Sequence, residues 1–326
     1  MESFLYIKLS GGVSLEKVKV ARLSVLSNSV LVVIKLAVGI SISSVSVLSE
    51  AIHSGLDLVA ALIALFAVSK SSKPPDRKHQ YGHGKIENVA AVIEALLIFA
   101  ASVWIIRETV VKITTGARVE APFWGLMVMA FSAAVNWVIS SLLMKTAVKT
   151  DSVALEADAL HLRTDVYTSA GVAVGLLLLW ITGIHLFDPL LAIGVALLII
   201  KAACELMVKA FYPLLDVSLP QDEEEEIRAI LQNYGDYFIE YHKLRTRKAG
   251  PQRFIDLHLV VPQYMNITAS HELCDIIEEK IMEKYPGAQV LIHVEPCRNE
   301  EDCLSCKESE QCQILLENSE EKGNNR

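Results

Sequence analysis

Histidine and aspartate recur at helical spacing inside two apolar stretches of this 326-residue chain. His53 precedes Asp57 by four residues, and His161 precedes Asp165 by the same interval. Residues four apart share one face of an α-helix, so each pair can point its imidazole and carboxylate in the same direction. Two facing pairs would supply two nitrogen and two oxygen ligands, a tetrahedral set that suits Zn²⁺. The alternative is that each residue is only a polar helix-packing group.

The apolar surroundings of these pairs favour the metal site. Ionisable residues inside membrane-spanning helices are costly and usually mark an ion or substrate pathway. Two matched pairs are harder to explain by packing than one pair would be. Outer partners of the ligands, or simple packing groups, would be Asn28, Glu50 and Asp158. Lys35 and Arg163 also lie at or near membrane depth, where the sequence offers them no role beyond pairing with an acid.

Composition places the chain among membrane proteins. Hydrophobic residues make up 52% of it and its mean hydropathy is +0.38, too apolar for an ordinary soluble protein. Residues 1–220 carry a formal charge of +2, whereas residues 221–326 carry −10. An acidic soluble part argues against a nucleic-acid partner and fits the attraction of cations. Residues 1–16 lack an apolar core followed by a cleavage site, so we expect no cleavable signal peptide.

Six stretches reach the roughly 20 mostly apolar residues that a spanning helix needs, and the fifth holds its polar residues in its first half. They lie at approximately 18–42, 45–69, 86–113, 121–147, 153–182 and 187–212. Lysine and arginine gather in the N-terminal segment and in the loops after the second and fourth spans. The loops after the first and fifth spans have none, and Lys112 and Arg118 make the third loop a mild exception. The positive-inside rule therefore predicts a multi-pass protein of the cell (inner) membrane with both termini in the cytoplasm.

Helix and strand patterns alternate in the soluble part. We expect a helix from Asp222 to Asn233, strands at 240–248 and 253–261, a helix capped by Ser270 and ending at Lys284, and a strand at 289–294. This αββαβ order predicts a small two-layer α+β domain. The predicted organisation is a cytosolic segment at 1–17, a six-helix transport domain at 18–213, a cytosolic domain at 214–298 and an acidic tail at 299–326. The tail is poor in apolar residues, so we expect it to be mobile.

The cysteines fall into two groups. Cys204 and Cys274 are expected to be buried. The second group gathers near the C-terminus and consists of Cys297, Cys303, Cys306 and Cys312. If that end is cytosolic, reduced thiols or a metal site are favoured over disulfides. Four close thiols could hold one Zn²⁺ or form a redox pair, and the pattern leaves this choice open.

A polar loop between the second and third spans carries Asp76, His79 and His83 after the Pro74-Pro75 pair. These three side chains would lie near one another if a short helix began at Pro75. The alternative is a solvated loop with incidental histidines.

Three runs carry a resemblance to a known family. Leu48-Ser-Glu-Ala-Ile-His-Ser-Gly-Leu-Asp57, Tyr81-Gly-His-Gly-Lys-Ile-Glu87 and Glu156-Ala-Asp-Ala-Leu-His-Leu-Arg-Thr-Asp165 resemble the cation diffusion facilitator family, and the similarity extends from about residue 15 to Cys297. The resemblance implies a homodimer with six membrane-spanning helices, cytosolic termini and a metallochaperone-like αββαβ domain, which exports divalent metal in exchange for protons. It implies a transport site at His53, Asp57, His161 and Asp165 and a loop site at Asp76, His79 and His83. Glu50 stands where many members carry Asp, which keeps the charge.

The resemblance also implies roles in the soluble part. It predicts a binuclear metal site at the dimer interface, with His242, His258, His271, His293 and Glu295 as ligands. The family often has Asp at the position of Glu295, and a longer carboxylate can still bridge two ions. Asp256 is a candidate outer partner of a ligand histidine. Lys85 and Asp216 match a family ion pair that ties the membrane and cytosolic parts together.

Ligand chemistry bears on the choice of metal. Zinc and cadmium members of the family resemble this His-Asp arrangement, whereas manganese-type members tend to use harder oxygen ligands. We predict a proton-coupled antiporter that exports Zn²⁺, with Cd²⁺ as a surrogate, by alternating access. The alternatives are an Fe²⁺, Co²⁺, Ni²⁺ or Mn²⁺ exporter of the same fold and a membrane metal sensor that does not transport. A metalloprotease or other enzyme is disfavoured, because the sequence has no His-Glu-x-x-His motif and no nucleophile beside a base.

Overall fold

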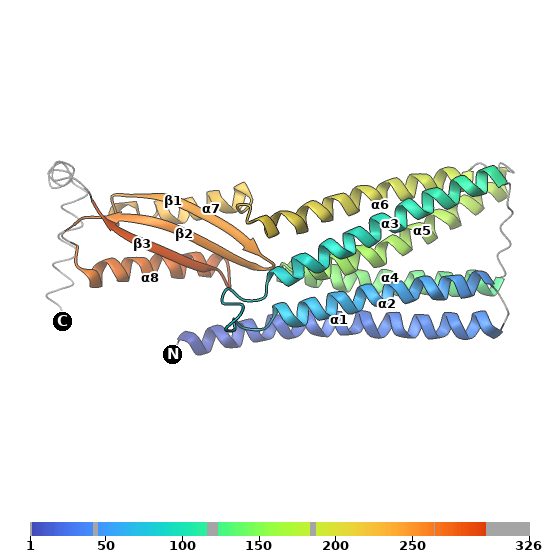
Figure 1. Cartoon of the computed structure of the whole chain (residues 1–326), viewed down its shortest axis with the longest axis horizontal. Helices are drawn as coiled ribbons and strands as arrows, with labels where there is room; N and C mark the ends of the chain where they lie inside the picture. The colour runs from blue at the N-terminus through green and yellow to red at the C-terminus, as the bar shows by residue number, and fades with distance from the viewer. Residues whose placement is uncertain (1, 42–44, 116–122, 183–186, 264, 298–326) are drawn as a thin grey trace. The chain divides into compact units, whose positions relative to one another are not determined.

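A computed structural model describes residues 2–41, 45–115, 123–182, 187–263 and 265–297 (Figure 1). The chain divides into two compact units, residues 1–215 and residues 216–326. Three cysteines of the predicted metal or redox cluster, Cys303, Cys306 and Cys312, lie outside the described residues, as does the predicted acidic tail.

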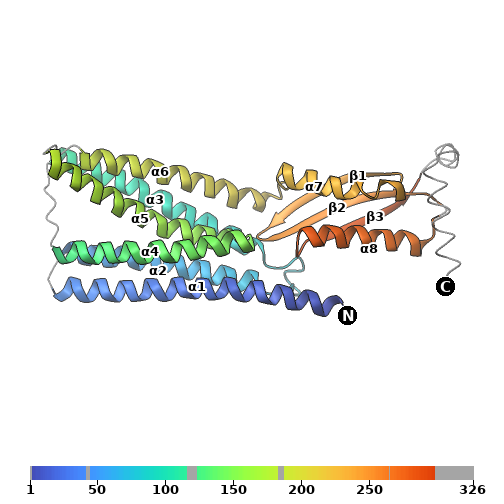
Figure 2. The same ribbon diagram turned by 180° about the vertical axis from the view of Figure 1, so that it is seen from behind.

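Six helices make up the first unit, and they run along one another in both views (Figures 1 and 2). Their bounds are α1 Glu2–Ser41, α2 Val45–Ser71, α3 Lys85–Thr115, α4 Phe123–Thr150, α5 Val153–Thr182 and α6 Phe187–Phe211. Among the described residues, α1, α2, α3, α4 and α6 each contain a stretch long and apolar enough to cross a membrane. The helix α5 contacts four of the others and has its polar residues in its first half. The prediction of a six-helix membrane domain is confirmed.

Side-chain burial in this unit follows the pattern of a membrane bundle. The fully buried positions of the bundle include many alanines, such as Ala60, Ala64 and Ala154, while Ile52 and Leu198 are among the exposed side chains. Small residues let membrane helices approach closely, and large apolar side chains can face lipid. The same pattern corrects the prediction for Cys204, which is exposed on the outer surface of α6.

The contacts between helices place α5 among four of the others. The helix α1 packs against α2 and α4, and α3 packs against α6. The helix α5 contacts α2, α3, α4 and α6. The two helices that carry the His-Asp pairs, α2 and α5, therefore lie against each other.

A buried carboxylate joins several helices at one end of the bundle. Glu87, in the first turn of α3, accepts hydrogen bonds from Ser71 and Ser152 at 2.5 Å each and lies 3.4 Å from the Lys17 ammonium of α1. Glu87 is fully buried and Lys17 is only 4% exposed. Buried charges are tolerated when they are paired in this way, so this network fixes α1, α2 and the start of α5 against α3.

The second unit is a three-stranded sheet with two helices. Its elements are α7 Gln221–Gln232, β1 Glu240–Ala249, β2 Gln252–Val261, α8 Ile267–Lys284 and β3 Gln289–Pro296. The strand order is β1-β2-β3, with β1 and β2 antiparallel and β2 and β3 parallel. Ile255, Leu257 and Leu259 of β2 pack in one core with residues of α7 and α8. Alternate side chains of a strand point to opposite faces, so His258 lies on the face away from that core. The predicted αββαβ order is confirmed.

The start of α8 differs from the prediction. Its N-cap is Asn266, whose side chain accepts the Ala269 N–H at 2.8 Å from an extended backbone conformation. The predicted cap, Ser270, lies one turn inside the helix and donates its hydroxyl to the Ile267 carbonyl. Both residue types cap helices well, and here the earlier one satisfies the free N–H group. Cys274 of this helix is buried, as predicted.

Candidate metal centres

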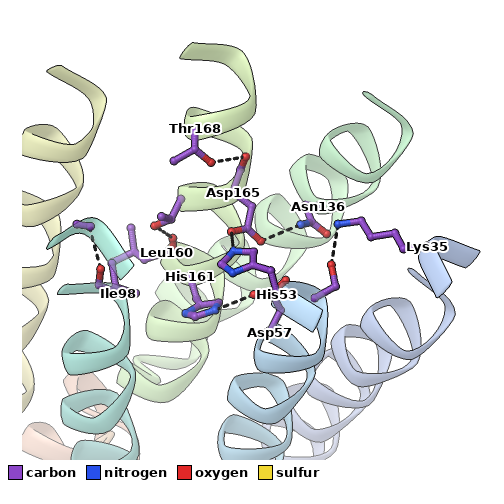
Figure 3. A network of polar contacts seen from close by, with 12 residues as sticks. Lys35, His53, Asp57, Ile98, Asn136, Leu160, His161, Asp165 and Thr168 are labelled. Carbon is purple, nitrogen blue, oxygen red and sulfur yellow. Dashed lines mark hydrogen bonds and ion pairs between the residues drawn. The ribbon is translucent and has the colours of Figure 1, made fainter. Parts of the chain in front are cut away.

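The membrane centre joins α2 and α5 through crossed pairs of side chains (Figure 3). The Nε2 atom of His53 lies 3.4 Å from Asp165 Oδ1, and that of His161 lies 3.2 Å from Asp57 Oδ1. Successive spans run in opposite directions, so α2 and α5 are antiparallel (Figure 1). The first residue of one pair is therefore level with the last residue of the other. Each imidazole meets the carboxylate of the neighbouring helix instead of the one on its own turn.

The four side chains of this centre suit a tetrahedral divalent ion. One ligand atom each from His53, Asp57 and Asp165 lies within 4.8 Å of the others, and His161 contacts Asp57 directly. Two imidazole nitrogens and two carboxylates form a ligand set that Zn²⁺ accepts. Asp57 and His161 are buried, whereas His53 is exposed. The site is therefore enclosed on one side and open on the other.

A small cavity of about 30 Å³ opens onto this site. It is lined by His53, His161, Thr164 and Asp165, together with Ile98 and Ile105 of α3. A cavity of this size has room for a water-sized occupant. Three of the four proposed ligands thus line a space in which a single small occupant can reach them.

Three further polar residues lie around this centre; the sequence indicated no role for Asn136 or Ser54, and for Lys35 only pairing with an acid. Asn136 of α4 donates its Nδ2–H to Asp165 Oδ2 at 3.3 Å. Lys35 of α1 donates to Ser54 Oγ at 2.7 Å, and Ser54 is adjacent to His53 in the chain. A polar side chain within an apolar span costs free energy unless it has a function or a partner, and that signal could have identified Asn136.

Of the predicted outer partners, Asn28 and Asp158 are buried at 2% and 0% exposure. The side chain of Glu50 lies outside the described residues. The burial of the first two is compatible with an outer role and equally with polar packing.

The loop centre is formed by a tight turn around a carboxylate. Asp76 Oδ1 lies 3.1 Å from His79 Nδ1, and Asp76 Oδ2 lies 3.3 Å from His83 Nε2. The backbone N–H groups of His79 and Lys78 donate to Oδ1 at 2.7 and 2.8 Å. These backbone hydrogen bonds lower the pKa of Asp76 to about 2, and the bond from His79 has the largest effect. The carboxylate is therefore an anion at any physiological pH and can bind a cation together with the two imidazoles.

The three residues do come together, but through a turn and not through the short helix at Pro75 that the sequence allowed as one way to do so. The segment is a turn in which the N–H groups of Asp76 and Gly82 both donate to the His79 carbonyl. Gly82 has a φ of 85°, which favours glycine, and this conformation turns the chain back toward Asp76. His83 faces Asp76 with its Nε2 atom, so Nε2 is the nitrogen that can bind a cation together with the carboxylate.

The cytosolic centre follows from the register of the three strands. His242 of β1 pairs with His258 of β2, and His258 pairs with His293 of β3, so the three histidines form one row across the sheet. The ring centroids of neighbouring histidines are 5.3 and 4.8 Å apart. A bulge follows His242, where Lys243 has a φ of 51° and one extra residue of β1 is inserted before the next pair. Such bulges redirect the side chains beside them.

One carboxylate lies among these histidines. Glu295 Oε1 is 2.8 Å from His258 Nδ1, Oε2 is 3.4 Å from His242 Nε2, and His293 Nε2 is 3.8 Å from Oε1. The hydrogen bond with His258, followed by the charges of His258, Lys243 and His242, lowers the pKa of Glu295. His242, His258 and Glu295 offer ligand atoms within 4.8 Å of one another, which fits a bound Zn²⁺.

Other residues predicted for the soluble part lie elsewhere within one chain. The Nδ1 atom of His271 pairs with Asp275 on the same exposed face of α8, at 3.3 Å. Asp256 faces Arg245 at 3.7 Å. Lys85 donates to the Leu214 carbonyl in the membrane unit, and Asp216 accepts from Arg247 in the soluble unit. A ligand role for His271 in a dimer, an outer role for Asp256 and the pairing of Lys85 with Asp216 therefore stay predictions.

Comparison with known proteins assigns both units. Residues 21–215 match the model of the cation efflux transmembrane domain, and residues 219–297 match that of the cation efflux protein cytoplasmic domain. The chain is 33% identical to the cation-efflux pump FieF of Yersinia enterocolitica over 276 residues, covering 82% of this chain and 89% of that pump. It is 34% identical to the uncharacterized transporter sll1263 of Synechocystis over 253 residues, covering 78% and 82% of the two chains.

Two solved structures match the soluble part. The zinc form of CzrB is 44% identical to this chain in sequence. The match covers 25% of this chain and 92% of the CzrB chain, with a TM-score of 0.24. The metal-bound C-terminal domain of the CzcD transporter from Thermotoga maritima is 27% identical to this chain. That match covers 25% of this chain and 98% of the CzcD domain, with a TM-score of 0.23.

A multi-pass membrane domain followed by this cytoplasmic domain defines a class of cation efflux transporters. The chain belongs to that family, the cation diffusion facilitators, which export divalent metals. It is a family of transporters and not of enzymes.

Proposed function

We propose that this protein exports Zn²⁺ from the cytoplasm in exchange for protons. The observation that carries the proposal is the crossed set of two imidazoles and two carboxylates between α2 and α5. Mixed nitrogen and oxygen ligands in a tetrahedral number suit Zn²⁺ and also accept Cd²⁺. The ligands come from two helices, so a small relative movement of α2 and α5 can change their separation and release the ion.

Proton coupling follows from the ligand chemistry. A metal ion and a proton compete for the same lone pair of an imidazole, so metal binding displaces protons and protonation weakens metal binding. In the proposed cycle, Zn²⁺ enters from the cytoplasm and displaces protons from His53 and His161. Rocking of the helices then exposes the site to the other side of the membrane, where protons return and Zn²⁺ leaves.

The proposed setting is a homodimer in the inner membrane, with both termini in the cytoplasm. The distribution of lysine and arginine over the loops supports this orientation. In the dimer, the row of histidines around Glu295 would hold resident Zn²⁺, with His271 as a further ligand, and would stabilise the transport-competent state. The loop centre at Asp76 would bind metal near the membrane surface, and Lys85 would pair with Asp216.

A direct flux measurement tests this proposal. Purified protein in sealed liposomes should transport Zn²⁺ and Cd²⁺ faster than Mn²⁺, Fe²⁺ or Co²⁺, and a pH-sensitive dye should record proton movement in the opposite direction. Faster transport of Fe²⁺, Co²⁺ or Mn²⁺ would assign the substrate to that ion instead. Metal binding without flux of any ion would favour a sensor, and metal flux without proton movement would contradict the antiport mechanism.

A further inference from the structure

A charged pair is exposed on α6 at the depth of the membrane. The Lys201 ammonium lies 3.7 Å from the Glu205 carboxylate, and the two side chains are 74% and 69% exposed. Lys201 lies near the middle of the apolar stretch that runs from Pro189 to Leu215. At about 1.5 Å of rise per residue, it is roughly 20 Å from either end of that stretch. The pair therefore projects from the bundle well inside the hydrocarbon region of a bilayer.

This ion pair joins two residues of one helix, so it does not tie α6 to a neighbour. In contrast, Lys209 reaches Glu156 of α5 at 2.6 Å and does link two helices. Charged side chains that face lipid near the bilayer centre are costly. A lysine can extend its four-carbon stem toward the membrane surface, but that length covers only part of the distance from Lys201. The exposed pair thus calls for a partner that is not lipid.

The residues around the pair form one continuous face of α6. Gly194, Lys201 and Val208 recur every seven residues, or two turns, and all three are exposed. Leu198 and Cys204 flank this line and are exposed as well. A Cβ atom added to Gly194 would meet no atom within 4 Å, so the space beside it is open. Small residues on such a face let a second membrane helix approach closely.

The charge of this face selects the kind of partner. One ammonium and one carboxylate sum to zero, whereas a site for an anionic lipid headgroup needs an excess of positive charge. Opposite charges one turn apart are complementary to a second copy of the same surface. If a twofold axis runs along the membrane normal, Lys201 of one copy can face the partner's Glu205, and the reverse pair forms at the same time. Both pairs are then shielded from lipid between the two helices.

We infer that α6 forms a membrane-embedded interface between two copies of this chain, closed by reciprocal ion pairs between Lys201 and the partner's Glu205. This inference rests on the proposed homodimer and adds to it a second contact besides the cytosolic one. Cys204, next to Glu205 on the same face, then lies close to the partner's Cys204.

Oxidation of the full-length protein in liposomes tests the interface. In a parent whose other five cysteines are replaced by serine, copper phenanthroline should link Cys204 of two copies into a dimer that dithiothreitol reverses. The matched control carries Cys204→Ser and Val33→Cys. Val33 is 64% exposed on α1, and α1 and α6 lie along opposite edges of the bundle in Figures 1 and 2. At the same ratio of protein to lipid, this control should remain uncrosslinked.

Charge reversal tests the reciprocal pairs. Lys201→Glu and Glu205→Lys, each in the Cys204 parent and with tags of different size, are produced together and oxidised. Mixed dimers should exceed either like dimer by about tenfold, because like charges face each other in the like dimers and opposite charges in the mixed one. Two differently tagged copies of the parent should mix at random. If the single variants do not fold, the double variant Lys201→Glu with Glu205→Lys, which keeps both charges, should crosslink with itself as the parent does.

Light scattering in detergent separates this inference from the proposed homodimer. A dimer whose Cys204 does not crosslink would overturn the α6 interface and leave the homodimer intact. A monomer that does not crosslink would overturn both. Crosslinking of Cys204 with random mixing of the two charge variants would overturn the reciprocal pairing, since an ion pair confined to one chain predicts that result.

Discussion

The membrane centre and the cytosolic centre use the same ligand types in different surroundings. In the membrane, two histidines and two aspartates meet in crossed pairs, and Asp57 is 2% exposed. In the cytosolic unit, three histidines lie around the carboxylate of Glu295, and the side chain of His293 is 65% exposed. Negative charge in the buried centre must be balanced by nearby cations such as protons or a metal ion, whereas water screens the exposed centre. Under the proposed mechanism, metal binding at the first centre is coupled to proton exchange, and metal binding at the second centre does not need to be.

The secondary-structure elements that hold the two centres also differ. The membrane ligands lie on two helices held together by side-chain packing, and such helices can shift against each other. The cytosolic ligands lie on three strands joined by backbone hydrogen bonds in a fixed register. A site that must open suits the helices, and a site that must keep its ion suits the sheet.

The largest expected effect comes from removing a membrane carboxylate. Asp57→Ala or Asp165→Ala should lower Zn²⁺ flux in liposomes by about 100-fold or more, because each removes an anion from the buried ligand set. Size-exclusion chromatography and Zn²⁺ binding by the cytosolic unit should be unchanged. Asp236→Ala, an exposed aspartate outside both centres, is the matched control and should transport at the parent rate.

Disabling the cytosolic centre should affect stability and leave the membrane centre able to bind. With free Zn²⁺ at 100 times Kd, the parent gains about 2.7 kcal/mol through binding to the native state alone. His258→Ala with Glu295→Ala should abolish that gain in thermal denaturation of the soluble unit. If the double variant also lost metal binding at the membrane centre, the two centres could not be independent.

Ligand exchange tests which centre selects the ion. His53→Asp should raise the ratio of Mn²⁺ to Zn²⁺ flux by about tenfold, because a carboxylate is a harder ligand than imidazole. His258→Asp makes the same change in the cytosolic centre and should leave that flux ratio as it was. Equal ratios in the two variants would show that His53 does not select the ion.

The smallest effect concerns pH at the cytosolic centre. The hydrogen bond with His258 lowers the pKa of Glu295, so the carboxylate is ionised above pH ~4.5 and protonates only as the pH falls through the lowered value. Loss of Zn²⁺ between about pH 7 and pH 5 should therefore reflect protonation of imidazoles. Glu295→Gln should weaken binding at every pH and leave the midpoint of this loss in place. A midpoint that moved by a full pH unit would mean that Glu295 itself titrates there.

Local periodicity determined the elements and the faces on which the ligands lie. The apolar runs predicted the spans, and the alternation of residues 253–261 predicted a strand with His258 on one face. The family motifs predicted candidate residues for three centres, and the structure brings a subset of each set close together. This worked because helical and strand periods are local properties of the chain, readable over a few turns or residues.

Only the tertiary structure decided which ligands meet. His53 lies 3.4 Å from Asp165 of the other helix, because α2 and α5 pack antiparallel, although the two residues are 112 positions apart in the sequence. The Asn136 bond, the Lys35–Ser54 contact and the bulge at Lys243 depend likewise on packing or register between elements. The loop at Asp76 closes by backbone hydrogen bonds to the His79 carbonyl, without a helix. Sequence spacing cannot encode such contacts, since they arise from the relative placement of separate elements, which the whole bundle or sheet fixes at once.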